Sequence, residues 1–225
     1  MLLSVHIPKT GGTKLQSLLK QIYHNKIHFD YGTERDLVAA RTCCPEILSD
    51  LEGFSAKFSC IYGHYHYLKY RDLFNDEKVI FVLRDPADRV ISQYRHIALH
   101  GERSVERHRL IMDGQMDVVH FSKFKFIGNA QSIYLEGLDF ETKNIFPLFA
   151  ESFGSSVEGL LRWLNEDPDK YTKYLKSSDK LVNSREGMAL PEKVIPIQEG
   201  DKDRIRKHCL DDLALIDRMR SFKPR

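Results

Sequence analysis

No uninterrupted apolar run in this sequence approaches the length that a helix needs to cross a lipid bilayer, so we expect no membrane span. The turn Pro-Lys-Thr-Gly-Gly at residues 8–12 arrives before the hydrophobic core of a signal peptide could form. If Met1 is the native start, we therefore expect a cytoplasmic protein. If the chain was trimmed from a secreted or Golgi protein, that expectation fails and the Golgi lumen is the alternative.

Cysteine is scarce, and its spacing is not that of a metal site. The 225 residues include four cysteines and no CxxC pair. Cys43 and Cys44 are adjacent, which is a poor geometry for a mutual disulfide. This usage suits a reducing compartment and argues against zinc fingers.

The sequence also lacks a large net charge, internal repeats and low-complexity linkers. A formal net charge of +2 is too small to favour bulk binding to nucleic acid, so any anionic partner must be recognised by local clusters of basic residues. Without linkers or repeats, the chain is predicted to form a single domain over residues 1–225, long enough to bury a substantial core.

The first half of the chain alternates short apolar runs with segments of helical periodicity. Strands are predicted over Leu2–Ile7, Ser59–Gly63 and Val79–Leu83, where apolar and β-branched residues dominate. Helices are predicted after Thr13 and after Asp85, because apolar side chains then recur at helical spacing. Strands that alternate with helices in this way indicate an α/β fold with a central parallel sheet flanked by helices.

The second half of the chain is predicted to be rich in helix. Beyond about Gly101 the pattern is mostly helical, with one candidate strand near Asn144–Phe149. A long last helix is predicted over about residues 201–222, because apolar residues mark one face of it throughout.

The turn between the first strand and the first helix has the composition of a phosphate-binding loop. Its glycines let the backbone approach an anion closely, and the following helix offers amides and the positive end of its dipole. The candidate ligands are Lys9, Thr10, Gly11, Gly12, Thr13 and Lys14, with the threonines as hydroxyl donors and the lysines as cations. The alternative is a tight turn that binds nothing. The Walker A pattern GxxxxGK[ST] is absent, because no glycine precedes Gly11 at the needed spacing.

A second candidate anchor follows the third predicted strand, at the edge where open parallel sheets bind ligands. Arg84 supplies a planar fork that matches a phosphate, while Arg89 and Ser92 share one helix face near its positive end. The alternative is that Asp85 caps the helix and Arg84 merely pairs with it. Two such turns in one sheet imply a ligand with two separated phosphates.

These residues resemble a known family. The sequence PKTGGT at 8–13 resembles the 5′-phosphosulfate-binding loop of sulfotransferases that use 3′-phosphoadenosine-5′-phosphosulfate (PAPS). The sequence RDPADRVISQY at 84–94 resembles their 3′-phosphate-binding motif, usually RDPxxRxxSxY. The likeness is strongest to the carbohydrate branch, which includes the heparan sulfate 2-O- and 6-O-sulfotransferases and small bacterial relatives. The resemblance implies a P-loop-like parallel sheet.

Three further stretches carry the likeness. Residues 62–68 are similar to the glycine-histidine segment with the catalytic base in the 2-O branch, and residues 128–135 are similar to an Asn-x-Gln stretch of the 6-O branch. Residues 149–153 are similar to a strand end of the relatives. The resemblance spans roughly residues 3–165 and is weak after Gly137.

The resemblance implies transfer of a sulfuryl group from PAPS to an acceptor hydroxyl by in-line displacement, with adenosine 3′,5′-bisphosphate (PAP) as the product. It assigns the base to His64 and the leaving-group cation to Lys9. It assigns the 3′-phosphate to Arg84 and Ser92, with Arg185 as a further contact. Lys14 departs from the pattern, because many relatives carry Ser or Thr there, and the adenine-side loop is recognisable only as Asn-Ser-Arg ending at Arg185.

His66 competes with His64 for the role of base. In a strand the two side chains point to the same face, so either reaches a substrate. An HxH pair is also compatible with zinc, but no third ligand stands out nearby and we expect no metal. The other eight histidines are interpreted as surface or core residues.

The acceptor is expected to be a glycan rather than a small alcohol or a lipid. A basic stretch from Arg95 to Lys125 is compatible with an acidic-glycan groove, although such a stretch is more often a solvated helix face. Tyr65, Tyr67 and Tyr70 either stack on sugar rings or pack inside the fold.

Two other functions fit parts of the pattern. One is a kinase that uses the glycine loop on ATP, which would need Mg²⁺ ligands and Walker A spacing, and neither is visible. The other is a nucleotide-binding relic of the fold without turnover. The presence of a residue for each role in catalysis and phosphate binding argues against the relic. These residues are Lys9, His64, Arg84 and Ser92.

Overall fold

The computed structural model describes residues 1–31, 40–74, 76–141, 143–171 and 188–224. The chain divides into two compact units. The sheet unit comprises Met1–Leu83, Ile133–Leu181 and Phe222–Arg225, and the helical unit comprises Arg84–Ser132 and Val182–Ser221. None of the described helices combines the length and the apolar character of a membrane span.

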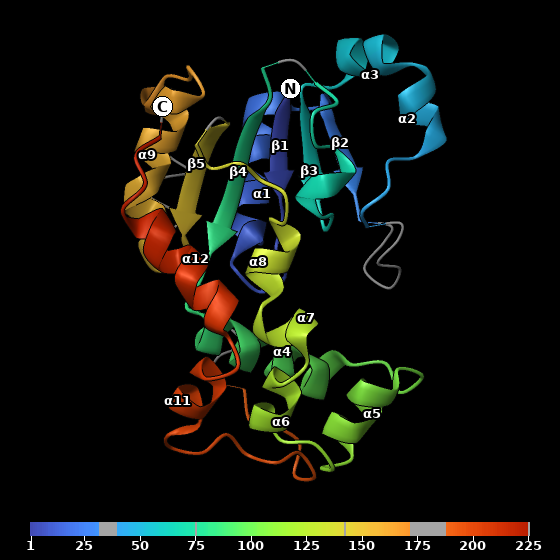
Figure 1. Ribbon diagram of the computed structural model, residues 1–225, viewed down its shortest axis with the longest axis vertical. Coiled ribbons are helices and arrows are strands. Elements are labelled where there is room, and N and C mark those ends of the chain that lie inside the picture. The colour runs from blue at the N-terminus through green and yellow to red at the C-terminus, as the bar shows by residue number, and fades with distance from the viewer. Residues whose placement is uncertain (32–39, 75, 142, 172–187, 225) are drawn as a thin grey trace. The chain divides into compact units, whose positions relative to one another are not determined.

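The sheet unit contains five parallel strands in the order β2-β3-β1-β4-β5 (Figure 1). The strands are β1 (Leu2–Val5), β2 (Ile27–Asp30), β3 (Cys60–Gly63), β4 (Lys78–Leu83) and β5 (Asn144–Phe149). The predicted central parallel sheet is confirmed. The first strand ends two residues earlier than predicted, and β2 was not predicted, because only two of its four residues are buried.

Apolar residues of two helices and the sheet form one core cluster of the sheet unit. Helix α1 (Gly12–Tyr23) contributes leucines at helical spacing, and α9 (Phe153–Trp163) contributes a second apolar stripe. These stripes pack with strand residues in one cluster, which includes Leu2, Leu15, Leu18, Tyr62, Ile80, Leu148, Val157 and Leu160. The spacing of apolar residues that predicted α1 therefore describes its buried face.

Shorter elements complete the sheet unit. They are α2 (Pro45–Ser49), α3 (Leu51–Lys57), and the 3₁₀ turns η1 (Tyr67–Lys69), η2 (Ala150–Ser152) and η3 (Pro168–Tyr171). Helix α8 (Ala130–Tyr134) begins in the helical unit and ends in the sheet unit.

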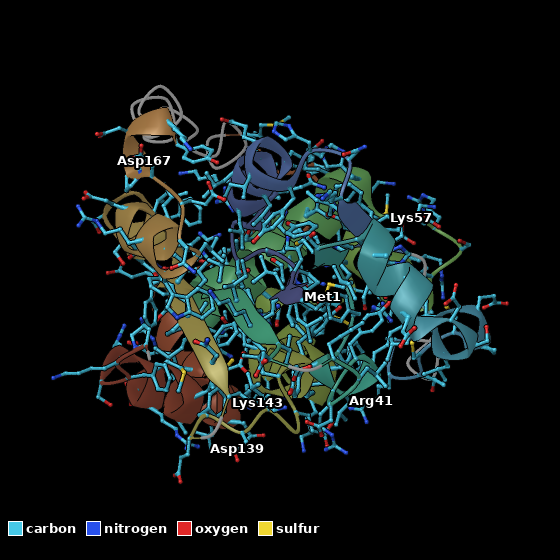
Figure 2. All side chains as sticks on the ribbon, turned by 90° about the horizontal axis from the view of Figure 1, so that it is seen from above. Met1, Arg41, Lys57, Asp139, Lys143 and Asp167 are labelled. Carbon is cyan, nitrogen blue, oxygen red and sulfur yellow. The ribbon has the colours of Figure 1, made fainter. Side chains whose placement is uncertain are left out.

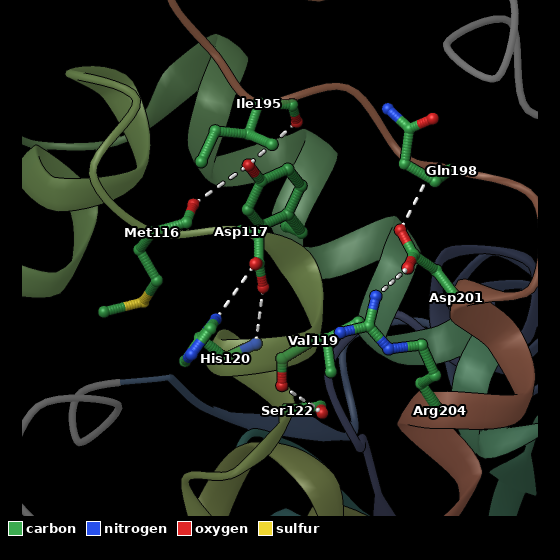
Figure 3. Close-up of polar contacts among 10 residues, drawn as sticks. Met116, Asp117, Val119, His120, Ser122, Ile195, Gln198, Asp201 and Arg204 are labelled. Carbon is green, nitrogen blue, oxygen red and sulfur yellow. Dashed lines mark hydrogen bonds and ion pairs between the residues drawn. The ribbon is translucent and has the colours of Figure 1, made fainter.

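The helical unit is built around α4 (Pro86–His100), with α5 (Glu106–Met112), α6 (Val118–Ser122), α7 (Lys125–Gly128), α11 (Asp201–Arg206) and α12 (Leu210–Arg220). Its core includes Val90, Ile97, Ile111, Phe121 and Ile205. Polar contacts also hold the unit together: Tyr94 places its hydroxyl 3.1 Å from the carbonyls of Met116 and Ile195, and Asp117 caps α6 through the amide of His120 (Figure 3).

The single long helix predicted over residues 201–222 is wrong, because the structure has two helices there. The break lies at Lys207–Cys209, where the side chain of Asn129 intervenes. Its amide nitrogen donates to the carbonyl of His208, and its oxygen accepts from the amides of Asp211 and Asp212. A tertiary hydrogen bond thus replaces the bonds of a continuous helix, although the apolar periodicity continues across the break.

Candidate functional site

The predicted phosphate loop joins β1 to α1 in the sheet unit. Lys9 has a φ of 69° and Gly11 has a φ of 92°, so two residues within three positions are left-handed. Such turns are typical of backbone concavities that bind anions. Glycine suits the conformation at Gly11, whereas the lysine adopts it at a cost of about 1–2 kcal/mol. Helix α1 has no acidic residue in its first turn and no side-chain cap, so none of its own first-turn side chains offsets its positive end.

Three side chains hold this loop in place. Thr10 is fully buried and donates its hydroxyl to the carbonyl of Ile7 at 2.9 Å. Tyr62 of β3 donates its hydroxyl to the carbonyl of Gly12 at 2.8 Å. A Cβ on Gly12 would overlap the ring of His6, so the loop packs closely against that ring. The Thr10 hydroxyl therefore stabilises the turn itself. The prediction that it donates to a bound anion is not supported, because its hydrogen is used within the loop.

The remaining loop residues differ in their accessibility. Thr13 is exposed in the first turn of α1, and Lys9 and Lys14 are half-buried. Any hydroxyl contact from the loop to an anion thus falls to Thr13.

His64 lies against this loop, immediately after β3. Its Nδ1 is 2.6 Å from the carbonyl oxygen of His6, and the two imidazole rings stack with centroids 4.2 Å apart. A carbonyl oxygen only accepts hydrogen bonds, so Nδ1 carries a hydrogen, and in the neutral imidazole the lone pair is then on Nε2. The contact therefore selects the tautomer that a general base needs.

His6 is the residue of this site that sequence reasoning missed. Burial, together with His64 and Lys9, lowers the pKa of its imidazole to about 3, so it stays neutral at physiological pH. It supplies the carbonyl that orients His64 and a ring that packs on Gly12. The signal was its position, since His6 directly follows β1 and precedes the loop.

His66 is separated from His64 in its contacts. Strand β3 ends at Gly63, so the strand alternation expected to align the two histidines is wrong. His66 is 2% exposed, stacks on Tyr134, and accepts a hydrogen bond from Arg41, which also pairs with Glu136 at 2.8 Å (Arg41 is labelled in Figure 2). Burial and Arg41 lower the pKa of His66 to about 4. These contacts describe a packing residue and make a weak base.

The second anchor opens the helical unit. Asp85 caps α4 by accepting from the amide of Asp88 at 3.0 Å, as the sequence predicted. The backbone amide of Arg84 donates to Gln131, whose side chain donates back to the carbonyl of Arg84. Arg89 is fully buried and donates to the carbonyl of Ile127, which makes it a packing residue of this unit.

Two other candidates of the second anchor are placed as follows. Ser92 is half-buried on α4. Arg185 lies outside the described residues.

The tyrosines expected to meet sugar rings instead pack inside the sheet unit. Tyr65, Tyr67 and Tyr70 are at most 1% exposed. Their hydroxyls donate to the carbonyl of Ile61 and to the carboxylates of Glu77 and Asp30. The alternative of stacking on sugars is therefore wrong for these three residues.

A different pair of aromatic residues is accessible beside His64. Phe29 is 41% exposed and Tyr31 is 37% exposed. Their rings are nearly parallel, with an angle of 13° between the planes, and the ring centroid of Tyr31 lies 5.1 Å from that of His64. Lys20 holds its ammonium 5.3 Å from the centre of the Phe29 ring.

The basic stretch of the helical unit contains both engaged and exposed side chains. Arg103 pairs with Asp113 at 3.0 Å, and Arg107 lies over the ring of Phe126. Lys123 and Lys125 are exposed. Among the described residues, no group of three or more His, Cys, Asp or Glu side chains is placed to hold a metal ion.

The sulfotransferase domain family matches residues 2–177, which is more than half of the chain. This chain belongs to the sulfotransferase family. The family and enzyme class predicted from the sequence are thereby confirmed. The match does not distinguish the carbohydrate branch from other branches.

Solved sulfotransferases share the fold. The mouse sulfotransferase SULT7A1, crystallised with PAP, is 16% identical and aligns with a TM-score of 0.55 over 98% of this chain and 86% of its own. A sulfotransferase from Alicyclobacillus acidocaldarius is 14% identical and aligns with a TM-score of 0.54 over 97% of this chain and 94% of its own. No curated protein sequence matches the chain.

Proposed function

We propose that this sulfotransferase moves a sulfuryl group from PAPS to a carbohydrate hydroxyl, with His64 as the general base. The observation that carries the proposal is the hydrogen bond from His64 Nδ1 to the carbonyl of His6 at 2.6 Å. It holds the lone pair of Nε2 beside the loop that is proposed to bind the donor. Sulfuryl transfer requires a base that removes the proton of the acceptor hydroxyl, and a loop that stabilises the negative charge of the departing phosphate close to that base.

The loop has the features of a cradle for the phosphosulfate end of the donor. Its left-handed turn at Lys9 and Gly11 suits an anion, as does the N-terminus of α1, whose first turn has no acidic residue. Gly12 has no room for a side chain against His6. We assign the anion contacts to Lys9, to the backbone from Thr10 to Thr13, to the Thr13 hydroxyl and to Lys14. PAP in the structure of the mouse relative supports this choice of donor.

Two residues of the chain then act on the reacting groups. His64 Nε2 takes the proton of the acceptor hydroxyl while the oxygen bonds to sulfur. Lys9 stabilises the negative charge that remains on the 5′-phosphate oxygen when its bond to sulfur breaks. No metal is assigned a role in this reaction.

The other end of the donor is assigned to the helical unit. Arg84 and Ser92 occupy the positions of the family's 3′-phosphate motif, and Arg84 has the fork that matches a phosphate. Arg185 is proposed as a further contact to the same phosphate.

The aromatic surface formed by Phe29 and Tyr31 supports a carbohydrate acceptor. Exposed aromatic rings beside a catalytic base offer a flat apolar face, which suits the face of a sugar ring. Lys20 over Phe29 adds a positive charge, which suits an acidic glycan. A glycan therefore fits this surface better than a lipid.

Ligand-dependent thermal unfolding tests the donor assignment. We expect PAP without Mg²⁺ to raise the melting temperature, because a ligand that binds only the folded state stabilises it. We expect ATP with Mg²⁺ to have a much smaller effect. The reverse result would support a kinase. Incubation with ³⁵S-labelled PAPS and a panel of sulfated and unsulfated polysaccharides, small alcohols and lipids then tests the acceptor, and label in the alcohols or lipids alone would exclude the glycan.

A further inference from the structure

A buried network of hydrogen bonds in the helical unit converges on the carboxylate of Asp212. Asp212 is fully buried in the first turn of α12. Its Oδ1 accepts from the amide of Ser132 at 2.8 Å. Its Oδ2 accepts from both the backbone amide and the side-chain nitrogen of Gln131, at 3.2 and 3.1 Å. The carboxylate thus fixes both the backbone and the side chain of Gln131.

Gln131 in turn holds both backbone groups of Arg84. Its Oε1 accepts from the amide of Arg84 at 2.9 Å, and its Nε2 donates to the carbonyl of Arg84 at 3.0 Å. The orientation of the amide follows from these partners, because the reversed amide would place NH₂ against the Arg84 amide. Gln131 therefore bonds to Arg84 as a neighbouring strand would, at the residue where β4 has already ended.

Asn129 anchors the other end of the network. Its Oδ1 accepts from the amides of Asp211 and Asp212, and its Nδ2 donates to the carbonyl of His208 at 3.2 Å. The two amides belong to the first turn of α12, so Asn129 caps this helix next to the contact between Asp212 and Gln131. Contacts between residues about 80 positions apart in sequence thereby determine the backbone of Arg84.

Burying a carboxylate costs desolvation free energy, which its hydrogen bonds must offset. Apolar residues of similar volume often replace buried ionic groups without loss of stability, so packing alone does not call for a carboxylate here. The network satisfies its carboxylate, and besides the first turns of α8 and α12 it holds both backbone groups of Arg84, a residue outside either helix. Capping two helices does not require these bonds to Arg84, so we take the direction of that arginine as their role.

We propose that Gln131 and Asp212 are positioning residues for Arg84, which they hold in the direction needed to grip the 3′-phosphate of the donor. The inference rests on the proposed function, because it takes Arg84 as the 3′-phosphate ligand. A preorganised fork gains affinity, because less freedom is lost on binding. The effect of the network is therefore expected to appear only with ligands that carry the 3′-phosphate.

Paired binding measurements isolate that effect. PAP and 5′-AMP differ only in the 3′-phosphate. The dissociation constant of 5′-AMP divided by that of PAP therefore reports how much the 3′-phosphate contributes to binding. For Gln131→Met, which keeps length and loses the hydrogen bonds, we expect this ratio to fall about tenfold, while binding of 5′-AMP changes by less than about twofold. With PAPS we expect KM to rise and kcat to change little, since no reacting atom is touched.

A second variant approaches the network from its other end. Asp212→Asn keeps the volume but turns an NH₂ group toward N–H donors, so we expect it to lower the same ratio. Ile111→Ala is the matched control, because Ile111 is fully buried in the core of the same unit and outside the network. It should lower the melting temperature and leave the ratio unchanged.

The outcomes are separable. An unchanged ratio in a folded Gln131→Met or Asp212→Asn protein would overturn the positioning role. A wild-type protein that binds PAP no better than 5′-AMP would instead overturn the assignment of Arg84 itself. Hydrogen exchange on the wild-type protein needs no variant: the amide of Arg84 should be protected, and exchange at the rate of an unstructured loop would refute the network.

Discussion

At the scale of single residues, the proposed base is distinguished by a contact with an atom of another residue. His64 and His66 are chemically identical and two positions apart, yet only His64 directs its Nδ1 at a carbonyl, that of His6. His66 accepts a hydrogen bond from Arg41, stacks on Tyr134 and has a lowered pKa. From the sequence, the family resemblance assigned the base to His64, but strand alternation alone left His66 as a rival, because it did not show where β3 ends.

Substitution of the two histidines tests this choice. We expect His64→Gln to lower kcat by about 10²–10⁴-fold, because a general base contributes that much to such a step. His66→Gln is the matched variant, and it should retain most of kcat while lowering the melting temperature, since it disturbs a buried contact. The assay is turnover of labelled PAPS. Loss of activity in a folded His66→Gln protein, with His64→Gln still active, would reverse the assignment.

At the scale of elements, the loop between β1 and α1 combines a strained backbone with Lys9, the proposed leaving-group cation. Lys9 is left-handed although its side chain disfavours that conformation. We expect Lys9→Gly and Lys9→Ala both to lose turnover, because both remove the cation. Only glycine relieves the strained φ, so Lys9→Gly should resist urea better than Lys9→Ala, by up to about 1 kcal/mol. An alanine variant as stable as the glycine variant would contradict a strained turn.

Some elements were predictable and others were not. The strands β1, β3, β4 and β5 and the helices α1 and α4 follow from apolar runs, helical spacing and the Asp-Pro cap. Strand β2 and the break between α11 and α12 escaped prediction. The first is short and half-covered, and the second depends on Asn129, which is distant in sequence.

At the scale of the whole molecule, acid should destabilise the fold through its buried histidines. Burial and Arg41 lower the pKa of His66 from 6.5 to about 4, so the folded state keeps it neutral while the unfolded state takes up a proton below about pH 6.5. The unfolded state then binds more protons, and stability falls as the pH falls from about 6.5 to about 4. His6, with a pKa of about 3, adds a change of the same sign.

Urea unfolding between pH 7 and pH 4 measures this effect. We expect the free energy of unfolding to fall over that range, with His66 contributing roughly 3 kcal/mol. His66→Gln should flatten the pH dependence, because the group that takes up the proton is gone. His24→Asn, at an exposed histidine, should keep the wild-type slope. Equal slopes for wild type and His66→Gln would contradict the buried neutral imidazole.

The division into two units bears on the donor. The phosphate loop and His64 belong to the sheet unit, and Arg84 and Ser92 belong to the helical unit. That all 225 residues form a single domain remains a prediction. The proposed grip on both ends of one nucleotide remains a proposal that the binding experiments test.

The sequence alone determined the parallel α/β class and the family, and it supplied the two motifs that are proposed to bind the donor, because these depend on local composition and spacing. Only the tertiary structure decided which histidine has the tautomer of a base, that Thr10 and Arg89 serve packing, and how the Arg84 backbone is held. Each of these depends on a hydrogen-bond partner or a neighbour from another segment, and chain order does not specify which segments meet.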